Sequence, residues 1–135
     1  MSSEDGASPV ELALGVMVLV VPVAIMVLSI APVFEHRNFA RRAAAEAART
    51  MVLTTGDPTS EALDLVNAQA IGMGIDPDNV TVELCGGAGC EVARGSVVTV
   101  GVSVVVEQLS AFLPIGSITV HETHSEQVDM FRSRP

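Results

Sequence analysis

The chain has 135 residues, of which 49% are hydrophobic, and its formal net charge is -9. This length allows one membrane anchor and one soluble module of about 100 residues, and it is too short for two independent cores. The acidic balance argues against nucleic-acid binding, because phosphate backbones repel a negatively charged protein, and no basic stripe interleaved with aromatic residues is present.

The N-terminal segment predicts a membrane anchor. A short acidic head, residues 1–6, is followed by a run from Leu12 to Phe34 that carries no charge. A helix rises about 1.5 Å per residue, so this run would be about 34 Å long, slightly more than the roughly 30 Å hydrocarbon layer of a bilayer. We therefore predict a transmembrane helix over residues 7–34, with the lipid bilayer as its partner. Pro22 and Pro32 predict local bends in it.

Helical character continues beyond the apolar run. Residues 35–49 are mostly strong helix formers and contain neither glycine nor proline. We expect the anchor to continue into water as a helical stalk over residues 35–55. Thr54-Thr55-Gly56 predicts its end.

A second, shorter helix is predicted from Pro58 to Gly72, with Asp57 as its N-cap. Leu63, Val66 and Ala70 recur at spacings of three and four residues. Such spacing places the three side chains on one face, which we expect to lie against a neighbouring element.

The hydrophobic period changes to two after Asn79. Alternating residues predict two antiparallel strands, one over residues 80–84 and one over residues 98–106, and a third strand over residues 117–125. Ser110 to Gly116, which contains a proline and a glycine, is predicted to be a crossover before the third strand. The predicted fold class is α+β: a pilin-like N-terminal transmembrane helix with a stalk, a short helix and a small antiparallel sheet. Residues 56–135 form the predicted exported domain.

Two cysteines, Cys85 and Cys90, are separated by Gly-Gly-Ala-Gly. A four-residue turn brings two Cα atoms close enough for a disulfide, which would form in an oxidising compartment. Two free thiols are the alternative. A metal site is a weaker interpretation, because two sulfurs are half of a tetrahedral ligand set and no second cysteine pair follows.

No catalytic motif is present. The segment His121-Glu122-Thr123-His124 contains the residue types of a zinc site, but its histidines are three apart in a predicted strand and should face opposite sides. Phosphate loops, dinucleotide fingerprints and nucleophile elbows are also missing from the sequence. We therefore predict no catalytic residue, no metal site, no cofactor and no enzymatic activity.

Charged and small residues of the first helix are candidate interaction sites. Glu11 at the edge of the apolar run would cost about 2.5 to 3.5 kcal/mol at the centre of a bilayer, so it is neutralised by a partner's amine or stays at the interface. Gly15 and Ala24 are candidate positions for close helix packing. The stalk also carries four arginines, which either form a solvated face or pair with Glu46 or with lipid phosphates: Arg37, Arg41, Arg42 and Arg49.

The order Gly6-Ala7-Ser8-Pro9-Val10-Glu11 before an apolar helix resembles a prepilin processing signal. The phrases SPVELALGVMVLVVP and FARRAAAEAAR further resemble the TadE/TadG-like family of minor pseudopilins in tight-adherence pilus systems. The resemblance implies that Gly6 and Ala7 flank a bond cut by prepilin peptidase and that Glu11 supports processing and docking. It also implies other pilin-like subunits and the pilus assembly platform as partners, and an ectodomain outside the cell membrane.

Two further functions are open at this stage. The chain would be a secreted binding domain if a signal peptidase cut after Ser29-Ile30-Ala31. It would be a membrane-anchored accessory subunit of a secretion machine if its domain lay inside the cell. The positive-inside rule favours that orientation, since acids precede the apolar run and arginines follow it.

Overall fold

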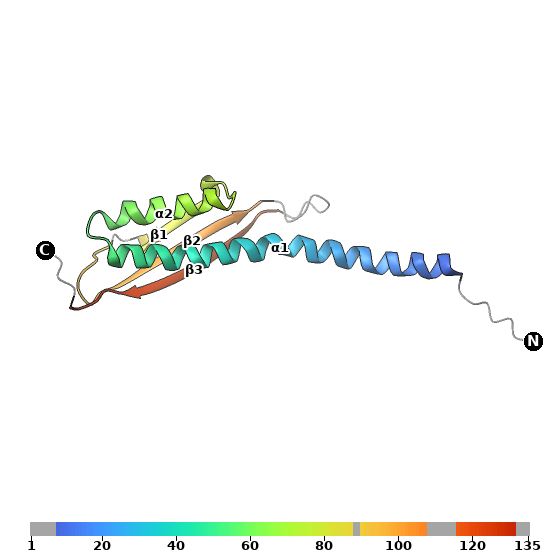
Figure 1. The fold of residues 1–135 in the computed structure, drawn as a ribbon, viewed down its shortest axis with the longest axis horizontal. Helices are drawn as coiled ribbons and strands as arrows, with labels where there is room; N and C mark the ends of the chain where they lie inside the picture. The colour runs from blue at the N-terminus through green and yellow to red at the C-terminus, as the bar shows by residue number, and fades with distance from the viewer. Residues whose placement is uncertain (1–7, 88–89, 108–115, 132–135) are drawn as a thin grey trace, which may run out of the picture.

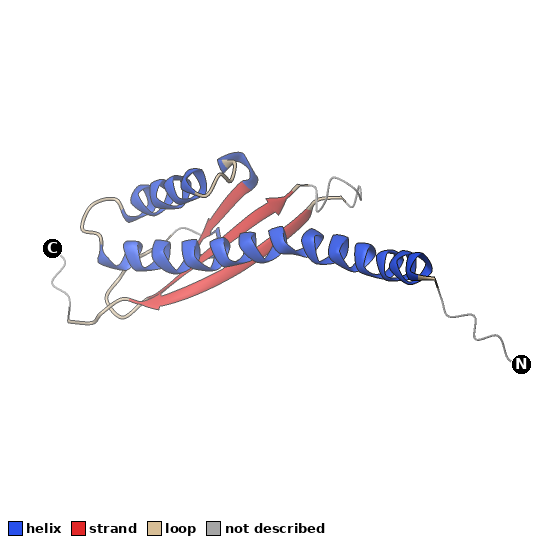
Figure 2. Ribbon diagram, turned by 45° about the vertical axis from the view of Figure 1, so that its right-hand side comes forward, coloured by secondary structure: helices blue, strands red, loops and turns tan. Residues whose placement is uncertain are grey.

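A computed structural model describes residues 8–87, 90–107 and 116–131 of the chain. Two helices lie on one face of a three-stranded antiparallel sheet, and the first helix extends far beyond the sheet as a single rod (Figure 1). The same two layers are visible after rotation (Figure 2). The α+β fold class predicted from the sequence, with a long apolar helix, a second helix and a small sheet, is therefore confirmed.

The first helix, α1 (Pro9–Leu53), is 45 residues long. At about 1.5 Å per residue it measures roughly 68 Å. It is assigned as one continuous helix through Pro22 and Pro32. Its N-terminal part is mostly exposed up to about Phe34, with Ser29 as a buried exception, whereas from Phe39 onward one face is buried by the rest of the domain.

The segment expected to be a free stalk is thus part of the domain core. Within residues 35–55, one face of α1 packs on the sheet and on the second helix, and this face is largely alanine. Alanine has the smallest apolar side chain, so it allows the helix to approach its neighbours closely. The packed domain begins near Phe39, well before the boundary at residue 56 that the sequence analysis gives.

The second helix, α2 (Pro58–Gly72), begins where the sequence predicts. The Asp57 carboxylate caps it by accepting hydrogen bonds from the backbone N–H groups of Thr59 (3.0 Å) and Ser60 (3.4 Å). The residues that it buries are Ala62, Val66 and Ala70. Leu63, expected on that stripe, is half-buried at its edge.

The two helices run antiparallel and are tied at both ends of their contact. Near the turn between them, the Thr54 hydroxyl donates a hydrogen bond to the Glu61 carboxylate at 2.5 Å. Farther along, the Gln69 amide donates to the Glu46 carboxylate of α1. The C-terminal end of α2 therefore points back toward the N-terminal half of α1 (Figure 1).

The sheet consists of β1 (Val80–Leu84), β2 (Val97–Val106) and β3 (Ile118–Gln127), in the order β1-β2-β3. Both pairs are antiparallel, and Val102 at the centre of β2 pairs with Val82 on one side and with Glu122 on the other. The predicted crossover at residues 110–116 is wrong in topology, because Val106 and Ile118 are direct partners in adjacent strands. Most of that connection, residues 108–115, lies outside the described residues.

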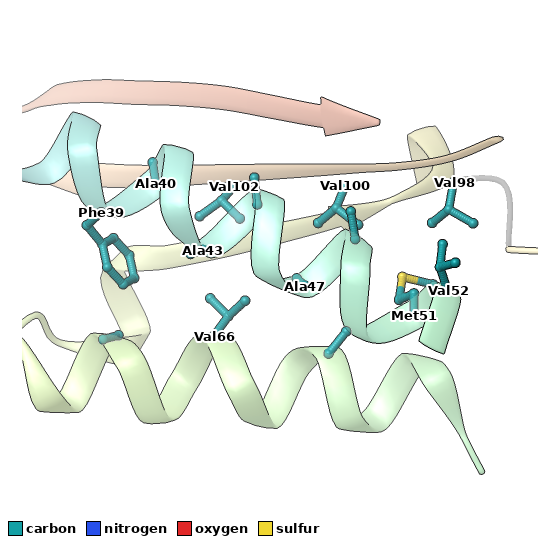
Figure 3. Close-up of a cluster of buried hydrophobic side chains, with 14 of the residues drawn as sticks. Phe39, Ala40, Ala43, Ala47, Met51, Val52, Val66, Val98, Val100 and Val102 are labelled. Carbon is teal, nitrogen blue, oxygen red and sulfur yellow. The ribbon is translucent and has the colours of Figure 1, made fainter. Parts of the chain in front are cut away.

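The core lies between the sheet and the two helices (Figure 3). Strand β2 contributes a row of buried valines to this core. They all point toward the helices because alternate side chains of a strand share one face. From α1 the core takes the alanine face, Phe39 and Met51, and Figure 3 shows Val66 of α2 reaching toward this face. The valines of the row are Val98, Val100, Val102, Val104 and Val106.

The edge strand β3 differs from β2 on its inward side. The residues that pair with the central valines, Glu122, His124 and Glu126, are polar and half-buried. Polar side chains pointing inward on an edge strand oppose the addition of a foreign strand, because such pairing would bury them. The free edge of β3 is in this way protected against aggregation.

Candidate functional site

The N-terminal end of α1 is closed by a capping box that involves Glu11. The Ser8 hydroxyl accepts a hydrogen bond from the Val10 N–H at 3.3 Å, and the Glu11 carboxylate accepts one from the Ser8 N–H at 3.4 Å. Reciprocal bonds of this kind satisfy donors that every helix start leaves free, and a carboxylate there also complements the positive end of the helix dipole. Glu11 therefore has a local structural role in addition to any role in docking.

The sequence itself carries the signal for this capping box. Ser8-Pro9-Val10-Glu11 matches the capping pattern of a serine followed three residues later by a glutamate, with a proline at the first helical position. The predicted processing bond between Gly6 and Ala7 lies just before this box, outside the described residues. The start of the helix is thus fixed two residues after that bond.

The exposed half of α1 is the largest candidate interaction surface. Among the described residues, α1 is the one helix long and apolar enough to cross a membrane, and almost none of its apolar segment is covered by the rest of the chain. Gly15 and Ala24, the predicted packing positions, both lie on this uncovered part. A Cβ atom added at Gly15 would meet no atom within 4 Å from any other described element of the chain, so this position is open to an outside partner.

Cys85 and Cys90 lie at disulfide distance, with Cα atoms 5.4 Å apart. This geometry fits the disulfide favoured by the sequence analysis. The backbone enters the loop through left-handed conformations, with φ of 52° at Cys85, 68° at Gly86 and 82° at Gly87. The two glycines accept these angles without strain, which explains why they follow the first cysteine.

Removing this disulfide by the double substitution Cys85→Ala and Cys90→Ala should lower the free energy of unfolding by about 2 kcal/mol, the loop-entropy value for so short a loop. Thermal unfolding of the full chain in detergent micelles measures the loss. Treating the unaltered protein with a reductant should lower its melting temperature to that of the double variant. An unchanged melting temperature in both experiments would show that the sulfurs are not bonded.

The two histidines of the segment 121–124 lie on opposite faces of β3, as the strand period predicts. His121 lies on the outer face, where its Nδ1 is 2.8 Å from the Ser103 hydroxyl. His124 is on the face toward α1 and lies 3.3 Å from the Glu126 carboxylate. Across the described residues, no group of three or more His, Cys, Asp or Glu side chains is arranged to hold a metal ion.

The four arginines of α1 are all exposed, but they differ in what lies beside them. Arg37 donates a hydrogen bond to the Glu122 carboxylate of β3 at 2.7 Å, which ties the helix to the edge strand. Arg41, Arg42 and Arg49 have exposed side chains. Arg49 lines an open cavity of about 450 Å³ between α1 and β3, together with His124, Glu126 and Asp129.

Together these features define a class of protein: a small α+β domain built onto the C-terminal half of a long helix whose N-terminal half is apolar and uncovered. Comparison with protein-family models, with curated proteins and with solved structures finds no match to this chain. The function is accordingly inferred from the residues and their arrangement.

Proposed function

We propose that this chain is a TadE-like minor pilin or pilus-assembly subunit of a tight-adherence pilus or a related secretion system. It acts by helix packing and not by catalysis. The observation that carries the proposal is the division of α1 into an uncovered apolar half and a half that forms the domain core. Such a helix needs a partner outside the chain along its first half, and a bilayer followed by neighbouring helices of the same kind supplies one.

The proposed mechanism begins with α1 held in the cell membrane. The apolar half then exchanges lipid for the corresponding helices of other subunits on the assembly platform. The hydrophobic effect does not drive helices together within lipid, so their association depends on close packing. Gly15 and Ala24 have the small side chains that permit such packing. Because one continuous helix joins the apolar half to the domain, the domain moves with it as it enters or primes the fibre.

The proposed orientation places the domain outside the cell. A disulfide between Cys85 and Cys90 persists in an oxidising compartment, and the close approach of these residues supports export. Labelling of intact cells with a membrane-impermeant thiol reagent, before and after treatment with an impermeant reductant, tests this orientation. In an external domain the two cysteines should become reactive only after reduction. Free thiols protected inside the cell would favour the accessory subunit with its domain in the cytoplasm.

Processing at Gly6 is the decisive prediction of this proposal. Mass spectrometry of the mature protein should find a chain that begins at Ala7, and Gly6→Leu should abolish cutting because a bulky side chain then occupies the scissile position. Gly15→Leu is the matched control, since it makes the same change at a glycine inside the helix and should leave processing intact.

Other mature N-termini would contradict the proposal in different ways. A chain beginning at Pro32 would indicate signal-peptidase cleavage and a secreted domain. A chain that keeps Met1 or Ser2 would indicate an uncut anchor.

A further inference from the structure

The position of the bilayer along α1 also fixes the height of the domain above it. If the charge-free run ends at Phe34, the hydrocarbon boundary lies at that level. Phe39, five residues further on, is already buried in the core. At about 1.5 Å per residue this separation is about 7 Å, so the domain has no spacer that would hold it clear of the membrane surface.

The C-terminal end of α2 is the part of the second helix closest to this surface. Figure 3 shows Val66 of α2 opposite the part of α1 that carries Ala43. Because the helices are antiparallel, advancing along α2 from Val66 corresponds to moving back along α1 toward Phe34. Ile71 then lies at the level of residue 38 and Met73 at the level of residue 36, about 6 Å and about 3 Å above Phe34.

Two large apolar side chains are exposed at this end. Ile71 has 66% of its surface exposed and Met73 has 56%. The other large apolar residues of α2, Leu63, Leu65 and Val66, are half-buried or buried. The headgroup layer of a bilayer is roughly 5 to 8 Å thick on each side, so both exposed side chains fall within it.

We propose that the C-terminal end of α2 lies in the headgroup layer of the bilayer that holds α1, with Ile71 and Met73 in contact with phospholipid. This contact rests on the membrane insertion of α1 and is independent of any role in a pilus. It would give the anchored domain a second point of attachment and would fix its rotation about α1 before assembly.

The charges nearby indicate which lipids suffice. Asp76 and Asp78 follow Met73 closely, and the Asp76 carboxylate caps the short turn η1 (Pro77–Asn79) by accepting from the Asp78 N–H at 3.1 Å. Two exposed carboxylates beside the patch would be repelled by anionic headgroups. The contact is therefore apolar in origin, and zwitterionic phosphatidylcholine is sufficient for it.

Tryptophan fluorescence tests the contact directly, because the chain contains neither tryptophan nor tyrosine. Met73→Trp and Ile71→Trp each place a single fluorophore in the proposed contact. Thr59→Trp places one at the opposite, exposed end of the same helix, and Val21→Trp places one within the membrane span. Each full-length variant is reconstituted into phosphatidylcholine vesicles with brominated acyl chains. The bromine atoms lie close to the headgroups in the vesicles used for positions 59, 71 and 73, and near the ends of the acyl chains in those used for position 21.

The Met73 and Ile71 variants should show blue-shifted emission and about twofold or greater quenching, since interfacial apolar groups sit about 5 to 10 Å into the boundary region. The Thr59 variant should show neither effect. The proposed contact would be overturned if the tryptophans at positions 71 and 73 had the same emission and quenching as the one at position 59 while Val21→Trp was quenched. That result would leave the membrane anchor intact. Lack of quenching at position 21 would overturn the membrane span itself, and the contact with it.

Discussion

Phe39→Ala should lower the free energy of unfolding by about 3 to 5 kcal/mol, the usual cost of removing a buried phenylalanine side chain. Phe39 is only 1% exposed and belongs to the cluster that joins α1, α2 and the sheet. Removing this side chain leaves a cavity between the two layers. The cavity could close only if backbone elements of both layers moved. Denaturant unfolding of the full chain in detergent micelles, followed by circular dichroism, measures the change.

Phe34→Ala is the matched control for this prediction. Phe34 lies on the same helix five residues earlier and is 59% exposed, so the same truncation removes no core contact of comparable extent. The unfolding midpoint of the domain should change little. Equal destabilisation by the two substitutions would contradict the placement of the core boundary between these residues.

Ala47→Leu should lower the free energy of unfolding by about 1 to 3 kcal/mol, because added methyl groups in a filled core force neighbours off their preferred positions. Ala47 is fully buried on the face of α1 that packs on the sheet and on α2 (Figure 3). The same denaturant experiment gives the loss. A larger side chain here should also reduce the quality of packing, visible as earlier exchange of the β2 amide hydrogens.

Ala45→Leu provides the comparison for this overpacking. Ala45 is half-buried and lines the open cavity beside β3, where a leucine has room. The free energy of unfolding of the Ala45→Leu variant should be close to that of the unaltered protein. If Ala47→Leu were as well tolerated as Ala45→Leu, the close approach of α1 to the sheet would not depend on alanine.

The boundaries of the elements were predictable because the chain marks them with local chemistry. Asp57 and Pro58 begin α2 at the residue that the sequence predicts, since an N-cap carboxylate and a proline at the first position act within one turn. The strands β1 and β2 follow the two-residue period closely. Such signals depend on neighbours in sequence and need no knowledge of the tertiary fold.

The buried face of residues 35–55 has a local signal in the sequence, but its partner does not. Pairs of buried apolar residues recur every four positions from Phe39 to Val52, and exposed charged residues such as Arg42 and Glu46 lie between them. The partner lies far away in the chain, at the valines of β2. Because that partner is not apparent from the sequence, the segment is predicted to be a stalk, whereas in the structure it is a core helix.

The candidate site shows the same division between local and distant signals. The spacing of Cys85 and Cys90 was enough to favour the close approach seen in the structure, because a short loop confines its own ends. The pairing of Arg37 with Glu122 joins residues 85 positions apart and has no sequence signature. The exposed pair Ile71 and Met73 becomes informative only when the direction of α2 relative to α1 is known.

The central place of α1 in the core has a consequence for biosynthesis. The ribosome makes the alanine face of α1 first, whereas the β2 valines that cover it are made about fifty residues later. During that interval the nascent chain presents an uncovered face at the membrane surface, and α2 is the first element that can shield part of it. Chains that stop before Val97 would never complete this cover, and quality-control proteases at the membrane should remove them.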